Sequence, residues 1–327
     1  MNPIAFFDAH EFERPFFAAN EDFPITFFAT RLEKHTAHLA RGFNAIICFV
    51  NDRLNADVLK ILAESGVRYI GLRSAGFNNV DLDAAKSLNI AVARVPDYSP
   101  YAVAEHTTAL LMILNRKIHR AHNRVRESNF SLNGLVGFDI HGKTVGVVGT
   151  GKIGRRFCKI MLGFGAHVLA FDSVHNDELR DEGVEYVDLH TLLRDSKVIS
   201  LHVPLTKQTY HLIDEAAFAR MQNRPLLLNT GRGALIDTKS LIRGLKSGRI
   251  EGAALDVYEE EEGIFFEDFS DKILKDDDLA RLLTFPNVLI TSHQAFLTQE
   301  ALSNIAQTTL ANLATFLKGE RNANFLV

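Results

Sequence analysis

The clearest fold signal in the sequence is the segment Val145-Gly146-Val147-Val148-Gly149-Thr150-Gly151-Lys152-Ile153-Gly154. Its apolar start predicts a buried strand over 145–148, and residues 152–164 predict a helix. The glycines between them follow the pattern G-x-G-x-x-G, in which the first permits a tight turn and the second lets the backbone approach a pyrophosphate. The third lets helix and strand pack closely, and the pyrophosphate meets free N–H groups at the helix N-terminus. This segment therefore predicts a dinucleotide-binding α/β domain.

The next predicted strand, 167–171, ends at Asp172, near the ~20-residue spacing at which such domains place an acidic residue. That carboxylate would accept hydrogen bonds from the adenosine ribose. Ser173, Val174 and His175 follow it, so no Arg or Lys side chain is present there to bind a 2′-phosphate. NAD is therefore expected rather than NADP. The residues predicted to bind it here are Gly149, Gly151, Lys152, Ile153, Gly154 and Asp172.

On both sides of this segment, short apolar runs alternate with helical patterns along most of the chain, which predicts parallel sheets. The expected strands are 25–29, 45–50, 68–73, 91–95, 198–202, 225–229, 252–255 and 288–291, and the expected helices include 57–65, 81–87 and 298–317. Residues 101–125 contain neither Pro nor Gly and predict one long helix, which would either link two domains or lie at a subunit interface.

The overall composition is that of a globular protein with two domains, because 327 residues exceed one ordinary hydrophobic core. A net charge of −4 gives no electrostatic reason to expect nucleic acid or an anionic membrane as a partner. Cys48 and Cys158 match no metal or disulfide spacing, so reduced thiols and no metal site are expected. The first residues lack the basic segment and apolar core of a signal peptide, which predicts a cytoplasmic protein.

Polar residues follow three of the later strands, at the sheet edge where open α/β sheets bind ligands. Arg232 lies between two glycines and can hold a carboxylate through two parallel hydrogen bonds. His293 could donate a proton, and a glutamate within 259–262 could orient it. Taken singly, each has a structural alternative. Most of the acidic segment 259–278, with ten carboxylates against Lys272 and Lys275, is expected to be solvated, Glu259 and Glu262 included.

These pieces together resemble the D-isomer-specific 2-hydroxyacid dehydrogenase family, and most closely its D-lactate dehydrogenase branch. The matching segments are Arg73-Ser74-Ala75-Gly76-Phe77-Asn78, Val95-Pro96-Asp97-Tyr98-Ser99-Pro100, Ala104-Glu105-His106, the glycine motif, Leu201 to Thr206, Asn229 to Gly233, Leu255 to Glu262 and His293 to Phe296. The resemblance implies two Rossmann-like or flavodoxin-like domains with parallel sheets and an active site in the interdomain cleft. The substrate domain would be discontinuous, 1–100 and 296–327, around an NAD-binding domain over 101–295.

The resemblance also implies the roles of individual residues. Arg232, Glu261 and His293 would be the catalytic trio, with Glu261 singled out because it stands five residues after Asp256. Asp256 would hold the nicotinamide side of NAD, in a pocket lined by His202, Val203, Pro204 and Thr230. The substrate carboxylate would be covered by Ser74, Ala75, Gly76 and Tyr98, and Phe296 would bound the side chain.

Pyruvate is the expected substrate, because the D-lactate branch is the nearest match and the aromatic walls of Tyr98 and Phe296 suit a methyl group. A longer or branched 2-keto acid is the alternative, since one methylene is worth only ~1–3 kcal/mol in a pocket. A non-catalytic, NAD-sensing corepressor is a second alternative, disfavoured by the absence of an extra interaction tail. The expected partners are the small acid and further copies of the chain, as a dimer or tetramer.

Overall fold

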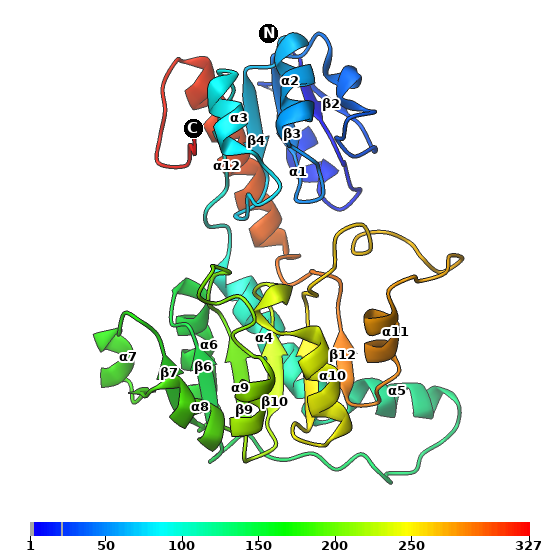
Figure 1. Ribbon diagram of the computed structural model, residues 1–327, viewed down its shortest axis with the longest axis vertical. Coiled ribbons are helices and arrows are strands. Elements are labelled where there is room, and N and C mark those ends of the chain that lie inside the picture. Colours follow the sequence, from blue (N-terminus) through cyan, green and yellow to red (C-terminus); the bar gives the residue numbers. More distant parts are fainter. Residues whose placement is uncertain (1–2, 21) are drawn as a thin grey trace. The chain divides into compact units, whose positions relative to one another are not determined.

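The computed structural model describes residues 3–20 and 22–327, and the chain divides into two compact units (Figure 1). Unit 1 comprises Met1–Ser99 with Leu297–Val327, and unit 2 comprises Pro100–Phe296. Each unit is built on a parallel sheet, which confirms the predicted α/β class. Within the described residues, no helix combines the length and the apolar character needed to cross a bilayer.

Unit 1 contains a five-stranded parallel sheet in the order β2-β1-β3-β4-β5. Its elements are β1 (Ile4–Phe6), α1 (Arg14–Ala18), β2 (Ile25–Phe27), the 3-10 helix η1 (Ala37–Ala40), β3 (Ala45–Cys48), α2 (Ala56–Glu64), β4 (Tyr69–Leu72), α3 (Leu82–Ser87), β5 (Ala91–Ala93) and α12 (Gln299–Leu317). This is the strand order of flavodoxin-like folds. The C-terminal helix α12 returns to this sheet, where the rings of Tyr69 and Phe316 lie 4.9 Å apart.

Unit 2 contains a seven-stranded parallel sheet in the order β12-β11-β10-β9-β6-β7-β8. Its strands are β6 (Thr144–Val148), β7 (His167–Phe171), β8 (Glu185–Tyr186), β9 (Val198–Leu201), β10 (Leu226–Asn229), β11 (Gly252–Leu255) and β12 (Val288–Ile290). Its helices are α4 (Pro100–Asn115), α5 (Ile118–Arg126), α6 (Lys152–Gly163), α7 (Asp177–Asp181), α8 (Leu189–Asp195), α9 (Glu215–Arg220), η2 (Gly233–Leu235), α10 (Thr238–Lys246) and α11 (Asp277–Leu283). The strand order reverses between β6 and β9, which is where a doubly wound sheet binds a dinucleotide.

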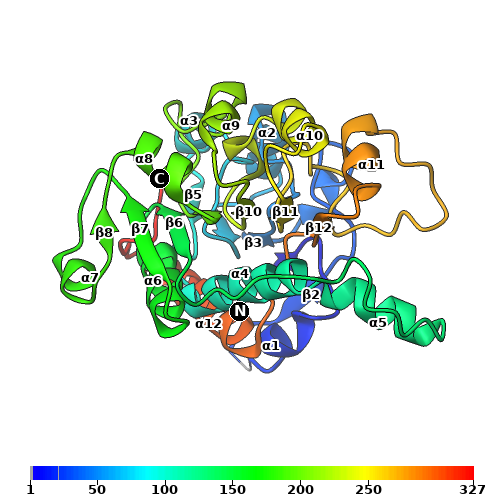
Figure 2. The same cartoon turned by 90° about the horizontal axis from the view of Figure 1, so that it is seen from below.

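Helices lie on both faces of the unit 2 sheet (Figure 2), and two clusters of buried apolar side chains fill the space between helices and strands. On one face, Leu111 of α4 and Phe157 of α6 pack against buried strand residues. On the other face, Leu193 of α8, Phe218 of α9 and Leu241 of α10 do the same. Because both faces are covered, the strands are continuous apolar runs, and the polar residues that follow them are held at the sheet edge.

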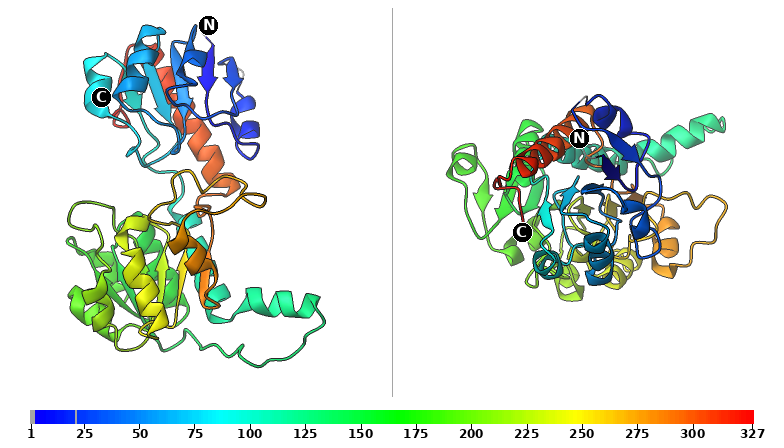
Figure 3. Two further views of the ribbon diagram at one scale, coloured as in Figure 1. Left: turned by 45° about the vertical axis from the view of Figure 1, so that its right-hand side comes forward. Right: turned by 90° about the horizontal axis from the view of Figure 1, so that it is seen from above.

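The single helix predicted over 101–125 is wrong, because the chain breaks between α4 and α5. Lys117 adopts a left-handed backbone conformation with φ of 51°, and its Nζ donates to the carbonyl of Val136. Nothing in the local sequence signals this break, since the stretch has neither Gly nor Pro. α5 has no buried residues, and it extends away from the body of unit 2 (Figure 3).

Candidate active site

The glycine-rich turn joins β6 to α6 in a shape that side chains would obstruct. Gly149 has φ of 96°, and a Cβ there would lie 2.8 Å from the carbonyl carbon of His202. A Cβ on Gly154 would lie 1.9 Å from the carbonyl oxygen of Gly149. Gly151 is the N-cap of α6, with no capping side chain and open space in front of it. The α6 N-terminus, which begins with Lys152 and Ile153, therefore fits a pyrophosphate.

Asp172 stands at the end of β7 beside this turn. Its Oδ2 accepts hydrogen bonds from Thr150 N at 2.6 Å and Thr150 Oγ1 at 3.1 Å, and its Oδ1 accepts one from Val174 N at 3.1 Å. Burial opposes ionisation, but the hydrogen bonds from Thr150 and Val174 outweigh it and hold the pKa of Asp172 below its usual value. The carboxylate is therefore charged at neutral pH and would repel a 2′-phosphate.

Replacing Asp172 with Asn should weaken NADH binding by about 10-fold, because a hydrogen bond to a charged group is worth ~1.5–3 kcal/mol. NADPH binding should weaken less, since a repulsive charge is removed with the acceptor. Fluorescence titration of both dinucleotides measures the two dissociation constants. Asp177→Asn, the same change at an exposed position nearby, is the control. An unaltered NADH/NADPH ratio in Asp172→Asn would show that this carboxylate does not contact the ribose.

The segment after β9 packs beneath the glycine turn. The His202 ring turns back into the unit, with Nε2 2.8 Å from Ser200 Oγ and the ring 5.3 Å from that of Phe157. Burial lowers the pKa of His202 to about 3, so the ring is neutral. Val203 is half-buried and Pro204 is exposed. The His202 ring therefore lies inside unit 2 and supports the glycine turn. This placement is more specific than the expected lining of the nicotinamide pocket.

The loop after β10 presents Arg232. The buried Asn229 shapes it, because its amide donates to the carbonyl of Arg232 at 2.9 Å and its oxygen accepts from Gly231 N at 3.1 Å. Between them, the Thr230 hydroxyl lies 2.8 Å from that of Thr107. Among the described residues, the Arg232 guanidinium makes one hydrogen bond, from Nη1 to Gly231 O at 2.8 Å. Its other donors remain available to a carboxylate or carbonyl.

The structure brings Glu261 and His293 together. Glu261 Oε1 lies 2.7 Å from His293 Nδ1, and Glu261 Oε2 accepts from Tyr258 N at 2.9 Å. Because Nδ1 is paired with the carboxylate, Nε2 is the ring nitrogen that could exchange a proton with a bound molecule. About a quarter of each side chain is exposed, 23% for His293 and 26% for Glu261, so the pair is accessible.

Asp256 is fully buried and organises the loop that carries His293. Its carboxylate accepts from Thr291 Oγ1 at 2.6 Å, Gln294 N at 2.9 Å and Ala295 N at 2.8 Å, and its carbonyl accepts from His293 N at 2.7 Å. Burial opposes ionisation of Asp256, yet the bonds from His106 and its neighbours keep its pKa below the usual value.

Sequence reasoning gave no role to His106, which stands on α4. Its Nε2 lies 3.4 Å from Asp256 Oδ1 and 3.2 Å from Thr291 Oγ1. His106 was part of the segment Ala104-Glu105-His106 that supported the family resemblance. Its contact with Asp256 could not be inferred, because the two residues are 150 positions apart in the chain.

The expectation that Glu259 is solvated is wrong. Its side chain is 17% exposed and lies 2.5 Å from His211 Nε2, and it also accepts from Thr238 Oγ1 at 2.9 Å. Other parts of the acidic segment are structural as well: Phe265 is buried, and Asp276 caps α11 and accepts from the Tyr258 hydroxyl. Local charge density could not reveal these contacts. Glu262 is exposed, as expected.

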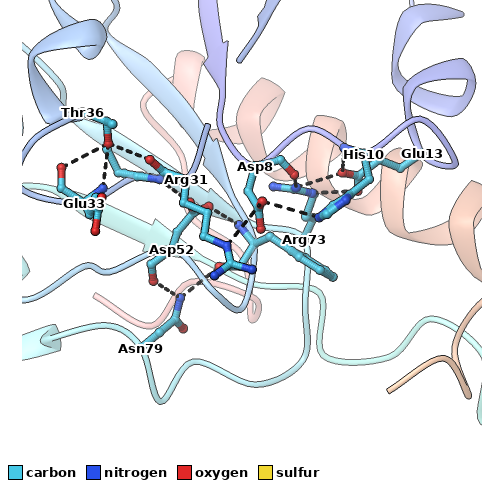
Figure 4. A network of polar contacts seen from close by, with 11 residues as sticks. Asp8, His10, Glu13, Arg31, Glu33, Thr36, Asp52, Arg73 and Asn79 are labelled. Carbon is cyan, nitrogen blue, oxygen red and sulfur yellow. Dashed lines mark hydrogen bonds and ion pairs between the residues drawn. The ribbon is translucent and has the colours of Figure 1, made fainter. Parts of the chain in front are cut away.

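In unit 1, a buried ionic network surrounds Arg73, the residue directly before the Ser74-Ala75-Gly76 segment (Figure 4). Arg73 is 1% exposed and binds Glu13 through Nε at 2.7 Å and Nη2 at 2.8 Å, and it also donates to the carbonyl of Asp8. Its guanidinium lies 4.3 Å from the Phe6 ring. A buried charge that lost these partners would be costly, so Arg73 anchors the end of β4 firmly.

The segment after Arg73 is held by further hydrogen bonds within unit 1. Ser74 Oγ donates to Gly76 O at 2.7 Å, and Arg94 Nη1 donates to Ala75 O at 2.9 Å. The carbonyl of Tyr98 accepts from Asn304 at 2.7 Å. Phe296, in unit 2, is buried. Across the described residues, no group of three or more His, Cys, Asp or Glu side chains is arranged to hold a metal ion.

A histidine–carboxylate pair at the same sheet edge as a dinucleotide-type turn is the arrangement of a nicotinamide-dependent dehydrogenase. Residues 108–295 match the family model described as D-isomer specific 2-hydroxyacid dehydrogenase, NAD binding domain. The chain belongs to the D-isomer-specific 2-hydroxyacid dehydrogenase family, as the resemblance predicted, and its second unit carries the family's NAD-binding domain.

Individual relatives are similar over nearly the whole chain. The D-lactate dehydrogenase of Escherichia coli is 53% identical over 93% of both chains. The 2-hydroxyacid dehydrogenase homolog 1 of Schizosaccharomyces pombe is 49% identical over 99% of both. Among solved structures, that of the pyruvate reductase of Chlamydomonas reinhardtii has a TM-score of 0.95 at 41% identity, covering 99% of this chain and 98% of the other.

Proposed function

We propose that this protein reduces pyruvate to D-lactate with NADH. The observation that carries the proposal is the contact between Glu261 and His293, because a histidine with its Nδ1 on a carboxylate can donate a proton from Nε2. Support for pyruvate comes from relatives named D-lactate dehydrogenase and pyruvate reductase, at 53% and 41% identity.

The residues of unit 2 divide the chemistry between them. The bound cofactor supplies the hydride that reduces C2 of the keto acid. Arg232 binds the substrate carboxylate or carbonyl and fixes its position. Protonated His293 gives its proton to the carbonyl oxygen as that oxygen becomes an alkoxide. Glu261 orients the imidazole through its contact with Nδ1. In the reverse direction, neutral His293 accepts the proton of the hydroxyl group.

Other residues are proposed to complete the substrate and cofactor sites. The Ser74-Ala75-Gly76 backbone and Tyr98 would cover the substrate carboxylate, and Phe296 would bound its methyl group. Asp256 and Thr230 would lie at the nicotinamide side of the cofactor. The location of the active site in an interdomain cleft stays a prediction.

The test is NADH oxidation with pyruvate compared with a panel of longer and branched 2-keto acids. Pyruvate should give the highest kcat/KM, and the product should be the D isomer of lactate. A preference for a larger acid would move the assignment to another 2-hydroxyacid dehydrogenase. No turnover with any acid, despite NADH binding, would favour a dinucleotide sensor such as a corepressor.

Replacing Glu261 with Gln should lower kcat/KM for pyruvate by about 10-fold or more, because a hydrogen bond to a charged group is worth ~1.5–3 kcal/mol and this one orients the His293 ring. The loss should appear in both directions, since the same ring donates the proton in reduction and accepts it in oxidation. The measurement is kcat/KM in both directions, with Glu260→Gln as the exposed control. Wild-type efficiency in Glu261→Gln would remove Glu261 from this role.

A homo-oligomer, a dimer or tetramer, is also proposed. α5 buries none of its residues, and apolar side chains are exposed on it and on the following loop. These are Ile118, Val125, Phe130, Leu132 and Val136, with Val136 83% exposed. Such a patch is typical of a protein interface.

A cytoplasmic location is proposed from the free, buried Cys48 and Cys158.

A further inference from the structure

Glu259 makes more contacts than its place in an acidic run requires. One carboxylate oxygen lies 2.5 Å from His211 Nε2. The other accepts hydrogen bonds from Thr238 Oγ1 at 2.9 Å and Thr238 N at 3.3 Å. Thr238 is the first residue of α10, and His211 belongs to the segment between β9 and α9. The carboxylate therefore joins three separate parts of unit 2.

His211 is itself held in a defined position. Its backbone has φ of 50°, and its N donates to Ala234 O at 2.8 Å. Its ring stacks on that of Tyr210 at 3.9 Å. Ala234 lies two residues after Arg232, so His211 is fastened to the same loop that presents the arginine. These contacts between loops lie at the edge of the sheet where the catalytic residues stand.

The loops carrying Arg232 and Glu259 are in direct backbone contact. A Cβ on Gly233 would lie 2.0 Å from the carbonyl carbon of Tyr258 and 2.4 Å from Glu259 N, so only glycine fits there. Tyr258 N in turn donates to Glu261, whose other oxygen meets His293. Any displacement of Tyr258 and Glu259 would therefore be transmitted to Glu261 and to the Arg232 loop.

We propose that Glu259, with His211 as its partner, is a positioning residue that holds Glu261 against His293 and keeps the Arg232 loop in register. The role rests on the proposed function, since it acts through the proton-donating pair. Glu259 itself touches no reacting atom. Its effect is on the geometry of Glu261, where an error of about 1 Å can cost on the order of 100-fold in rate.

The experiment compares Glu259→Gln with Glu260→Gln, the same change at the exposed neighbour. A glutamine cannot accept hydrogen bonds from His211 and Thr238 together through both of its head-group atoms. Glu259→Gln should lose about 10–100-fold in kcat with pyruvate and NADH, and the NMR signal of the His293 Nδ1–H proton should move upfield, as in Glu261→Gln. NADH affinity should be unchanged. Glu260→Gln should match the wild type in all three measurements.

Two further variants test the pathway of the effect. In Glu259→Gln/Glu261→Gln the losses should be less than multiplicative, because residues that act through one another are not additive. His211→Asn should move the His293 signal in the same direction as Glu259→Gln does, since asparagine tolerates the left-handed backbone at this position. Fully multiplicative losses, or a fall in Tm alone with kcat and the His293 signal unchanged, would overturn the proposal.

A readout without turnover separates this proposal from the proposed function. The NMR signal of the His293 Nδ1–H proton, identified by its absence in His293→Asn, should move upfield in Glu259→Gln, because its hydrogen bond to Glu261 is weakened. If the wild type reduces no 2-keto acid but this shift is seen, the proposed function fails and the positioning role stands. If catalysis is found and neither the signal nor kcat changes in Glu259→Gln, the positioning role fails.

Discussion

Replacing His293 with Asn is expected to lower kcat/KM for pyruvate reduction by about 10²–10⁴-fold, the usual contribution of a positioned acid or base. The variant removes the proton that would otherwise reach the carbonyl oxygen as the alkoxide forms. Asparagine is the suitable replacement because His293 has φ of 52°, a backbone conformation that asparagine tolerates better than alanine or glutamine. The loss can then be assigned to the side chain and not to a strained loop.

The measurement is steady-state kinetics with pyruvate and NADH, together with the dissociation constant of NADH. The dissociation constant should stay close to that of the wild type, because the glycine turn and Asp172 are untouched. His190→Asn, at an exposed position on α8, is the control and should be fully active. A His293→Asn enzyme with more than one tenth of wild-type efficiency would mean that another group donates the proton.

Replacing Arg232 with Lys is expected to cost about 2 kcal/mol or more in kcat/KM, because hydrogen bonds to charged groups are worth ~1.5–3 kcal/mol. This is roughly a 30-fold loss. An ammonium group keeps the charge but cannot make the planar two-point contact of a guanidinium. The backbone around Arg232 should be preserved, since Asn229 holds it through the main chain. The defect should therefore lie in substrate binding and orientation.

The test is kcat and KM for pyruvate, with the NADH dissociation constant as a measure of the intact cofactor site. Arg220→Lys, on the exposed side of α9, provides the matched control. The NADH constant should change little in both variants. Wild-type efficiency in Arg232→Lys would exclude Arg232 as the substrate clamp, and an equal loss in Arg220→Lys would point to a general effect on the fold.

The strand–turn–helix segment around Gly149 was predictable because its signals are local. Glycine spacing, a preceding apolar run and an acidic residue after the next strand are all properties of neighbouring positions. The strands 167–171 and 252–255 have the bounds that were predicted. The three-residue strand β1 was not predicted, although β2 and β5 are equally short and were expected within 25–29 and 91–95. It nevertheless pairs with both β2 and β3 in the unit 1 sheet.

Local sequence also placed Arg232, Glu261 and His293 at the ends of successive strands, because parallel strands end at one edge of a sheet. It could not say which glutamates of the acidic run have partners. That depends on His211, 48 residues before Glu259, and on Thr238 at the start of α10. The break at Lys117 likewise depends on the carbonyl of Val136, 19 residues away. Contacts between distant segments supply the energy that overrides local preference, so these features exist only in the folded chain.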